Sequence, residues 1–265
     1  YDSSWAQDVD GSPLASQQLL QTLDHLAWSQ ELRWNGSAFG DLLDFTLGGF
    51  YYEQEGTLEA RVTLPYAGLD FIHGPDETPA DSKAVFLHTE WHLTDALTAI
   101  AGVRWTEDFK DYIYRRRNPD LTIPQACNPG FPFGPPIGGA QPPNCLLVNL
   151  YEPPTTPYND DRIDWRLGLS YQFTDDFMGY VSASTGYKGG GVNPRPFYPA
   201  QILAFNPEEL TTYEIGAKTD LMDNRLRLNG AVFFNDYKDI ILNLSNCTAQ
   251  TGSAATGVPC ALPAN

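Results

Sequence analysis

The sequence predicts an all-β fold, a segment of a transmembrane antiparallel β-barrel. Long segments alternate apolar and polar residues with period two, which is the pattern of a strand with two different faces. The connections between these segments are alternately short and long. The chain has 265 residues, of which 13% are aromatic. It contains no run of about eighteen apolar residues, so strands rather than a helix would have to cross a bilayer.

The clearest alternation lies in the hairpin from Asn206 to Leu244, which is expected to turn at Asp223 and Asn224. In its second strand, Arg225 to Tyr237, one parity is apolar and the other is mainly polar. The apolar parity comprises Leu226, Leu228, Gly230, Val232 and Phe234. Two-faced strands of about nine to eleven residues are what a bilayer requires of a barrel.

In the first half of the chain, the same pattern predicts four strands. They are His25 to Asn35, Asp41 to Glu53, Ser82 to Leu93 and Leu97 to Asp108, and the fourth can extend through Tyr112 and Tyr114. Residues 1 to 24 are expected to form a loop with a short helical turn near Gln17 to Leu23. Gln54 to Asp81 lacks sustained alternation and contains Pro65, Pro75 and Pro79, so a long loop is expected there, with local structure around Arg61 to Leu64.

The second half contributes the strands Asp164 to Thr174 and Phe177 to Tyr187 before the hairpin, which brings the expected number of strands to about eight. Asn118 to Asp160 is the longest irregular segment, and loops of more than about fifteen residues are usually functional or disordered. Lys188 to Pro207 is expected to form a further loop. The chain ends in a polar segment from Asn243 to Asn265.

The lengths of the connections carry information about the membrane. Those after the first, third, fifth and seventh strands are short, whereas those after the second, fourth, sixth and eighth are long. Outer-membrane barrels typically have brief periplasmic turns and extended extracellular loops. Aromatic residues near strand ends fit the girdles found at membrane interfaces, and they include Trp34, Trp91, Trp105, Trp165 and Phe173.

Three stretches resemble the late barrel segment of TonB-dependent outer-membrane receptors. They are NPEELTTYEIGAKTDLMDNRLRLNGAVFFNDYKDI from Asn206, STGYKGGGVNPRPF from Ser184 and LTAIAGVRWTEDFK from Leu97. The resemblance spans nearly the whole chain, is weakest in the loops and is specific in the combination of motifs. It implies that the strands form an open, curved sheet belonging to a barrel of about 22 strands with a plugged lumen.

The resemblance also implies an active-transport receptor in the bacterial outer membrane. Such a receptor binds a scarce ligand, for example a ferric siderophore, and imports it with energy from the TonB–ExbB–ExbD complex. In that family a plug domain and a short TonB-contacting segment precede the barrel. Residues 1–265 are therefore expected to be a partial barrel domain that lacks the plug and the C-terminal strands, in contact with membrane lipid and lipopolysaccharide.

Ligand contacts are expected from the long loops and from lumen-facing residues near them. The candidates by position are Tyr112, Tyr114, Arg115, Arg116, Tyr187, Lys188 and Arg195. The run Arg115 to Arg117 could also meet an anionic ligand or lipopolysaccharide phosphate through bidentate hydrogen bonds. The alternative, a solvated strand end in a very acidic protein, is favoured for this run.

Four cysteines lie in two loops, as Cys127 with Cys145 and Cys247 with Cys260. In an exported protein this arrangement favours two local disulfides, one of three possible pairings. Free thiols in a reducing compartment are the alternative. Neither pair has the short spacing of a zinc site.

Two motifs invite a metal-binding or enzymatic interpretation. The stretch from His88 to His92 lacks the glutamate that follows the first histidine in metalloproteases, and on a strand His88, Glu90 and His92 are expected to be polar lumen residues. The glycines of Gly186 to Gly191 lack the spacing of a phosphate-binding loop and are expected to bend a strand end. No nucleophile motif is present, so the sequence predicts transport rather than catalysis, with no metal site or cofactor.

The net charge of −17 argues against binding of nucleic acid, which requires a basic surface. Two alternatives to a transport receptor stay open from the sequence. One is a passive outer-membrane porin. The other is a secreted soluble β-sandwich, such as a carbohydrate-binding or glycosidase domain, whose apolar faces would be buried between two sheets.

The alternation also assigns the two faces of the sheet. The residues expected to face lipid are Leu167, Leu169, Val181, Leu226 and Leu228. Those expected to face the lumen are Arg166, Ser170, Glu214, Lys218 and Arg227. The sheet is expected to be open, with His25 to Asn35 unpaired with Arg225 to Asn243.

Overall fold

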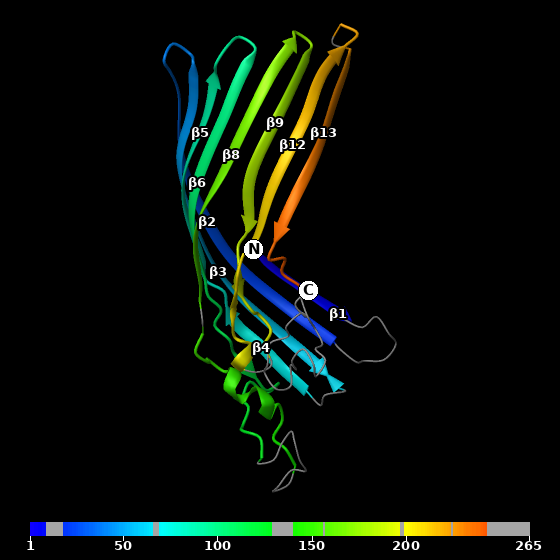
Figure 1. Ribbon diagram of the computed structural model, residues 1–265. Helices are drawn as coiled ribbons and strands as arrows, with labels where there is room; N and C mark the ends of the chain where they lie inside the picture. The colour runs from blue at the N-terminus through cyan, green and yellow to red at the C-terminus, as the bar shows by residue number, and fades with distance from the viewer. Residues whose placement is uncertain are drawn as a thin grey trace.

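A computed structural model describes residues 1–8, 18–65, 69–128, 140–155, 157–196, 199–223 and 225–242. Antiparallel strands dominate these residues (Figure 1). Among the helices of this described part, none has the length and hydropathy needed to cross a membrane.

Eight long strands form the frame of the molecule, as expected. They are β2 (Gln18–Ala38), β3 (Leu43–Leu64), β5 (Ala80–His92), β6 (Leu97–Lys110), β8 (Tyr158–Thr174), β9 (Phe177–Lys188), β12 (Glu208–Leu221) and β13 (Leu226–Lys238). Short elements accompany them: β1 (Asp2–Asp8), β4 (Leu69–Glu77), β7 (Arg116–Arg117), β10 (Gly191–Val192), β11 (Ala204–Phe205) and the 3₁₀ turns η2 (Cys145–Leu150) and η3 (Pro199–Gln201).

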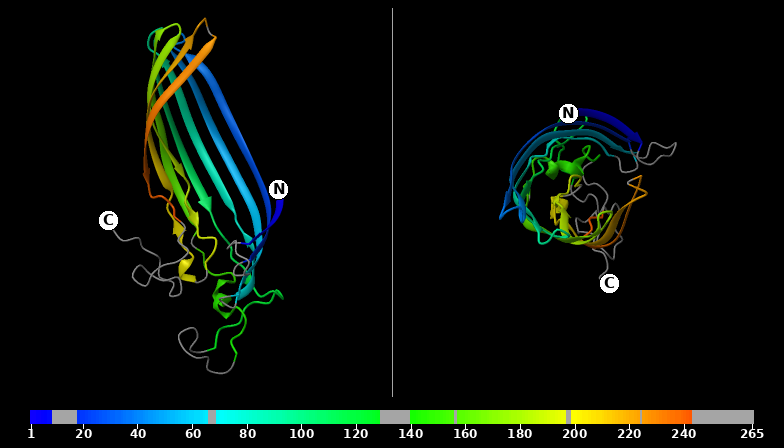
Figure 2. Two further views of the ribbon diagram at one scale, coloured as in Figure 1. Left: turned by 90° about the vertical axis from the view of Figure 1, so that its right-hand side faces the viewer. Right: turned by 90° about the horizontal axis from the view of Figure 1, so that it is seen from above.

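The long strands pair in chain order as four consecutive hairpins in one sheet, β1-β2-β3-β5-β6-β8-β9-β12-β13. The sheet curves into a wall, and seen along the strands it forms an open arc (Figure 2). Within the described ranges no ladder joins β2 to β13, so the expected open sheet is confirmed. The alternative of a two-sheet sandwich is wrong, because all the long strands belong to a single sheet.

The two ends of the wall differ in their connections (Figure 1). At the end drawn uppermost, which we call the turn end, one tight turn joins the two strands of each of the four hairpins. At the opposite end, the loop end, long segments link one hairpin to the next. The predicted alternation of short and long connections is therefore a property of the fold.

The two faces of the wall are chemically different, as the alternation predicted. One outward row runs across five strands through Trp34, Leu47, Leu87, Val103 and Trp165, which are successive cross-strand partners. The predicted lipid-facing residues Leu167, Leu169, Val181, Leu226 and Leu228 lie on the same face, and each is at least 39% exposed. Their exposure in water would be costly, but it is what a bilayer-facing surface requires.

The inner face is concave, so large side chains on one strand overlie the backbone of the next. A Cβ added to Gly48 would lie within 2.2 Å of the Phe86 ring, and one added to Gly216 would lie within 2.5 Å of the Tyr180 ring. Both distances are shorter than any real contact, so the glycines are needed for close approach.

Two of the expected loops are wrong. Residues 1 to 24 contain β1 paired with the start of β2, from Asp2 opposite Asp24 to Asp8 opposite Gln18, instead of a helical turn. Gln54 to Asp81 contains the rest of β3 and all of β4, which pair from Thr57 to Leu64. These ladders lie toward the loop end, beyond the apolar outward rows, and their residues lack the sustained hydrophobic alternation of the other long strands.

Two strand boundaries also differ from expectation. The strand β8 begins at Tyr158 rather than Asp164, and β6 ends at Lys110 without reaching Tyr112 and Tyr114. The chain leaves the β5–β6 ladder there and turns toward β4, because Ile113 pairs with Glu77.

Candidate functional site

The connections at the loop end pack together into one unit. Side chains from β4, from the segment after β6, from η2, from the start of β8 and from the segment after β9 form a common core. It comprises Phe71, Tyr112, Tyr114, Leu147, Leu150, Tyr158, Val192 and Ile202. We call β4 with residues 111–128, 140–155, 189–196 and 199–205 the cap. Seen along the strands, η2 and the segment containing β10 and η3 lie inside the curve of the sheet (Figure 2).

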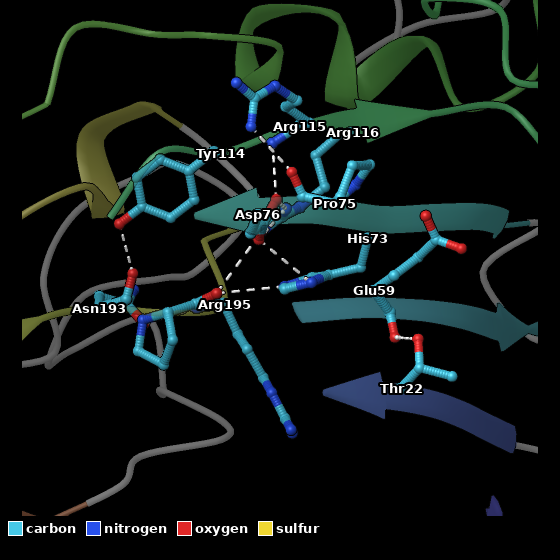
Figure 3. A network of polar contacts seen from close by, with 11 residues as sticks. Thr22, Glu59, His73, Pro75, Asp76, Tyr114, Arg115, Arg116, Asn193 and Arg195 are labelled. Carbon is cyan, nitrogen blue, oxygen red and sulfur yellow. Dashed lines mark hydrogen bonds and ion pairs between the residues drawn. The ribbon is translucent and has the colours of Figure 1, made fainter. Parts of the chain in front are cut away.

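A buried ion pair holds the cap together. Asp76 of β4 is 0% exposed and Arg116 of β7 is 1% exposed. Arg116 Nη1 donates to both carboxylate oxygens at 3.0 and 2.8 Å, and the Arg115 backbone N–H donates to Asp76 Oδ1 at 2.7 Å (Figure 3). Charge-assisted hydrogen bonds of this length are strong, and a buried carboxylate needs them.

The third segment of the cap joins the same network through its backbone. The Pro194 carbonyl accepts from Arg116 Nη2 at 3.4 Å and lies 3.2 Å from His73 Nε2, while Tyr114 Oη donates to the Asn193 carbonyl at 2.6 Å. Three connections that are distant in sequence thus meet within one hydrogen-bonded cluster (Figure 3).

The ionisation of His73 is controlled by this environment. Burial, together with the positive charge of Arg116, lowers the pKa of His73 to about 3. The ring is therefore neutral near pH 7. Its Nε2 lies 3.2 Å from the Pro194 carbonyl oxygen and its Nδ1 lies 3.2 Å from Asp76 Oδ2, so its single proton serves one of these two acceptors. Burial also raises the pKa of Asp76, and Arg116 opposes that shift.

Acidification is expected to loosen the cap through His73. Below about pH 6.5 the ring takes up a proton when the cap opens but not while it is closed, so opening becomes favoured by roughly tenfold per pH unit down to about pH 3. Hydrogen exchange at the Gly74 and Ile113 amides, corrected for intrinsic rates, measures this. His73→Gln should show a weaker pH dependence, and an identical dependence in both proteins would contradict the assignment.

Three of the ligand-contact candidates from the sequence are core residues of the cap. Tyr112 is 6% exposed and Tyr114 and Arg116 are less exposed still. Arg115 extends to the cap surface, where it forms ion pairs with Glu77 at 2.8 Å and Glu152 at 3.4 Å. The sequence favoured a solvated strand end for the arginine run. That interpretation is wrong for Arg116, because its side chain is buried and paired with Asp76.

The other three candidates lie along the wall and at its mouth. Tyr187, near the end of β9, donates from Oη to Asp108 Oδ2 at 2.7 Å. The Lys188 side chain is 69% exposed, and its Nζ lies 3.6 Å from Glu208 Oε1. Arg195 lies exposed in the cap segment after β10. Lys188 and Arg195 are therefore the accessible cations among the candidates.

Tyr187 lies where β8 and β9 separate, a gap in the wall that we call the fork. The β8–β9 ladder extends only to Arg166 opposite Ser184, and toward the loop end the two strands separate (Figure 1). Arg162 fills the fork with its guanidinium 4.2 Å from the centre of the Tyr187 ring. Arg162 also forms ion pairs, through Nε with Asp164 Oδ2 at 3.3 Å and through Nη1 with Glu209 Oε1 at 3.7 Å. The fork is therefore closed by stacking and ion pairing rather than by backbone hydrogen bonds.

The histidines of β5 lie on the inner face near the turn end. His88 Nε2 is 3.4 Å from Glu90, and His92 Nε2 is 3.0 Å from Asp44. Each histidine thus has its own carboxylate, and no three potential ligands among the described residues come together as a metal site. The positions fit the polar lumen lining expected from the sequence.

One of the predicted disulfides lies in the cap. Cys127 and Cys145 are bonded, with 4.8 Å between their Cα atoms, and tie the segment after β6 to the start of η2. Cys247 and Cys260 lie outside the described residues, and their pairing stays a prediction.

A curved wall of long antiparallel strands with an apolar outer face, tight turns at one end and a folded cap at the other is the geometry of a membrane barrel. Residues 1–262 match the family described as TonB-dependent-receptor-like β-barrels. The chain belongs to the TonB-dependent receptors. Its outward apolar rows are therefore lipid-facing, and the cap lies at the mouth of the lumen.

Relatives among these receptors align over most of the chain. The pesticin receptor of Yersinia pestis is 24% identical over 256 residues, which are 96% of this chain and 33% of the relative. The probable TonB-dependent siderophore receptor PiuA of Acinetobacter baumannii is 31% identical over 95 residues, 34% of this chain and 13% of the relative. The chain thus spans about a third of the length of the pesticin receptor.

The fold is also found among solved receptors. The ferric yersiniabactin uptake receptor FyuA from Yersinia pestis superposes with a TM-score of 0.63 at 24% identity, covering 85% of this chain and 30% of that one. At this identity the likeness establishes the fold.

The sequence did not reveal Asp76, His73 or Arg162 as site residues, because their partners lie far away in the chain.

Proposed function

We propose that this chain is part of an outer-membrane receptor that binds a scarce ligand, such as a ferric siderophore, and imports it with energy from the TonB–ExbB–ExbD complex. The loop end faces the outside and the turn end faces the periplasm. The remainder of the receptor supplies the plug and the segment that contacts TonB.

The observation that carries this proposal is the cap. A passive porin conducts through an open lumen, whereas here three connections fold inside the curve of the wall around a buried ion pair. A folded structure at the mouth supports capture of a ligand rather than free passage. The relatives agree, since one is named a probable TonB-dependent siderophore receptor and another a ferric yersiniabactin uptake receptor.

The ligand is proposed to meet the cations at the mouth. Lys188 and Arg195 are exposed, so they can offer charge-assisted hydrogen bonds to the anionic oxygens of a metal chelate. Replacing both by alanine should weaken ligand binding by about tenfold or more, since a hydrogen bond to a charged group contributes roughly 1.5 to 3 kcal/mol. Arg225→Ala, at the turn end, is the matched control and should bind as the wild type does.

Uptake in cells separates the proposal from its rival. A strain that lacks the gene would be compared with one carrying the full-length receptor, each supplied with a panel of radioactive ferric siderophores. We expect uptake of at least one chelate only with the receptor, and its loss when TonB is also deleted. Uptake that persists without TonB would favour the passive porin.

A further inference from the structure

Arg195 has a restricted backbone, although it lies exposed at the mouth of the lumen. A proline stands on each side of it, at Pro194 and Pro196. Each proline fixes its own φ, and Pro196 also confines Arg195 to extended conformations. The local sequence thus removes much of the freedom that an exposed loop residue normally has.

Buried side chains from other segments hold the backbone just before Arg195. Tyr114 Oη donates to the Asn193 carbonyl at 2.6 Å. The next carbonyl, that of Pro194, accepts from Arg116 Nη2 at 3.4 Å and lies 3.2 Å from His73 Nε2. The three side chains that make these contacts are each at most 5% exposed. Two consecutive carbonyls are therefore fixed from inside the cap.

Asn193 completes this support with its own polar groups. Its backbone N–H donates to the Leu203 carbonyl at 3.2 Å, and its Nδ2 donates to the Gln201 carbonyl at 3.0 Å. Its Oδ1 accepts from the Arg195 backbone N–H at 3.2 Å. Every polar atom of Asn193 thus has a partner, and the last of these bonds sets the direction in which the chain enters Arg195.

The Arg195 side chain is free of such contacts. It points away from the buried cluster (Figure 3), and within the part of the chain that the structure describes no carboxylate pairs with its guanidinium. Lys188 differs, because its Nζ already has Glu208 Oε1 at 3.6 Å. An unpaired guanidinium on a fixed backbone is preorganised to meet an anionic oxygen from outside.

We propose that Tyr114 is a positioning residue for ligand capture and acts through Arg195. Its hydroxyl holds the Asn193 carbonyl, so that the guanidinium meets the anionic oxygens of an arriving metal chelate without a prior search by the loop. Pro194 and Arg195 are exposed, so a few hydrogen bonds decide how often the segment has its binding conformation. The apparent affinity falls with that fraction. This inference rests on the proposed function, in which Arg195 contacts the ligand.

The first test needs no ligand and uses Tyr114→Phe in the full-length receptor. This variant keeps the aromatic ring in the core of the cap and removes only the hydroxyl. Hydrogen exchange at the Asn193 and Arg195 amides should accelerate by about fivefold or more, since a buried carbonyl loses its donor. The Gly74 and Ile113 amides bond across β4 without this hydroxyl and should change by less than about twofold. Unchanged exchange at Asn193 and Arg195 would overturn the proposal.

The second test measures binding of ferric citrate, and of each ferric siderophore in the uptake panel, to the same receptor. Tyr114→Phe should weaken binding by about fivefold, because fewer molecules present Arg195 correctly. In an Arg195→Ala background it should have no further effect, whereas in a Lys188→Ala background the full effect should remain. An equal loss in the Arg195→Ala background would overturn the positioning role.

Pro194→Gly reaches the same segment from the surface and decides the matter if Tyr114→Phe also accelerates exchange at Gly74 and Ile113. It frees the backbone before Arg195 without touching the core, and its effect on binding should likewise vanish in the Arg195→Ala background. Pro154→Gly, at another exposed proline of the cap, is the matched control and should bind as the wild type does.

The two tests separate this inference from the proposed function. A wild-type receptor that binds none of the chelates would count against the proposed function. The exchange rates at Asn193 and Arg195 would still show whether the Tyr114 hydroxyl positions this segment.

Discussion

Replacing Asp76 by alanine is expected to open the cap while leaving the barrel wall folded. The substitution leaves the Arg116 guanidinium, which is 1% exposed, buried without its counter-charge. Removing one partner of such a pair typically costs about 3 to 5 kcal/mol. Exchange at the Gly74, Glu77 and Ile113 amides, which bond across β4 and the segment after β6, should accelerate by about a hundredfold or more.

Two comparisons make this expectation specific. Asp70→Ala breaks the Arg61–Asp70 pair, which has similar geometry at 2.8 and 3.0 Å but is roughly half-exposed, and it should cost less than about 1 kcal/mol. The double variant Asp76→Leu with Arg116→Met removes both charges and should recover much of the lost stability. Equal effects of Asp76→Ala and Asp70→Ala would show that the buried pair does not hold the cap.

Leu167→Arg is expected to destabilise the barrel by about 2 to 4 kcal/mol, because it places a charge on the lipid face near the membrane midplane. Leu167 is 55% exposed and stands between Ala101 and Ala183, several rows from either charged edge of the wall. Its neighbours are small and apolar, so no nearby carboxylate offsets the charge. Unfolding of the full-length receptor by denaturant in lipid vesicles measures the cost.

Ser170→Arg is the control on the same strand. Ser170 lies on the inner face between Thr98 and Tyr180, in a lumen lined by polar side chains, and an arginine there keeps contact with water. Its cost should be far smaller than that of Leu167→Arg. Similar costs at the two positions would mean that the outward row does not face lipid, and the membrane assignment of the sheet would fail.

The strands that cross the membrane could be read from the sequence because two solvents act on them. Lipid on one face and water on the other impose a strict alternation, as in Leu167, Leu169 and Val181 against Arg166 and Ser170. Where the wall continues beyond the membrane, this constraint ends. The end of β3 and β4 was therefore missed, although they pair from Thr57 to Leu64 with a single register shift between Leu58 and Ala60.

The candidate site was predictable only in outline. Exposed basic residues such as Lys188 and Arg195 could be picked out by their place in loops of a resembling family. Burial of Arg116 could not, because its partner Asp76 is 40 residues away and lies in a segment with no recognisable pattern. A charge pair of this kind is specified by the meeting of two loops, and neither loop carries a local signal of it.

The open form of the sheet was implied by the resemblance to the TonB-dependent receptors. The sequence by itself determined the class of fold, the number of long strands and the face that each residue of a membrane strand presents. These follow from local rules, since period two, turn length and apolar content act over a few residues. The cap and the fork between β8 and β9 were decided only by tertiary structure. Each depends on strands or loops distant in sequence lying side by side, which sets burial and charge together.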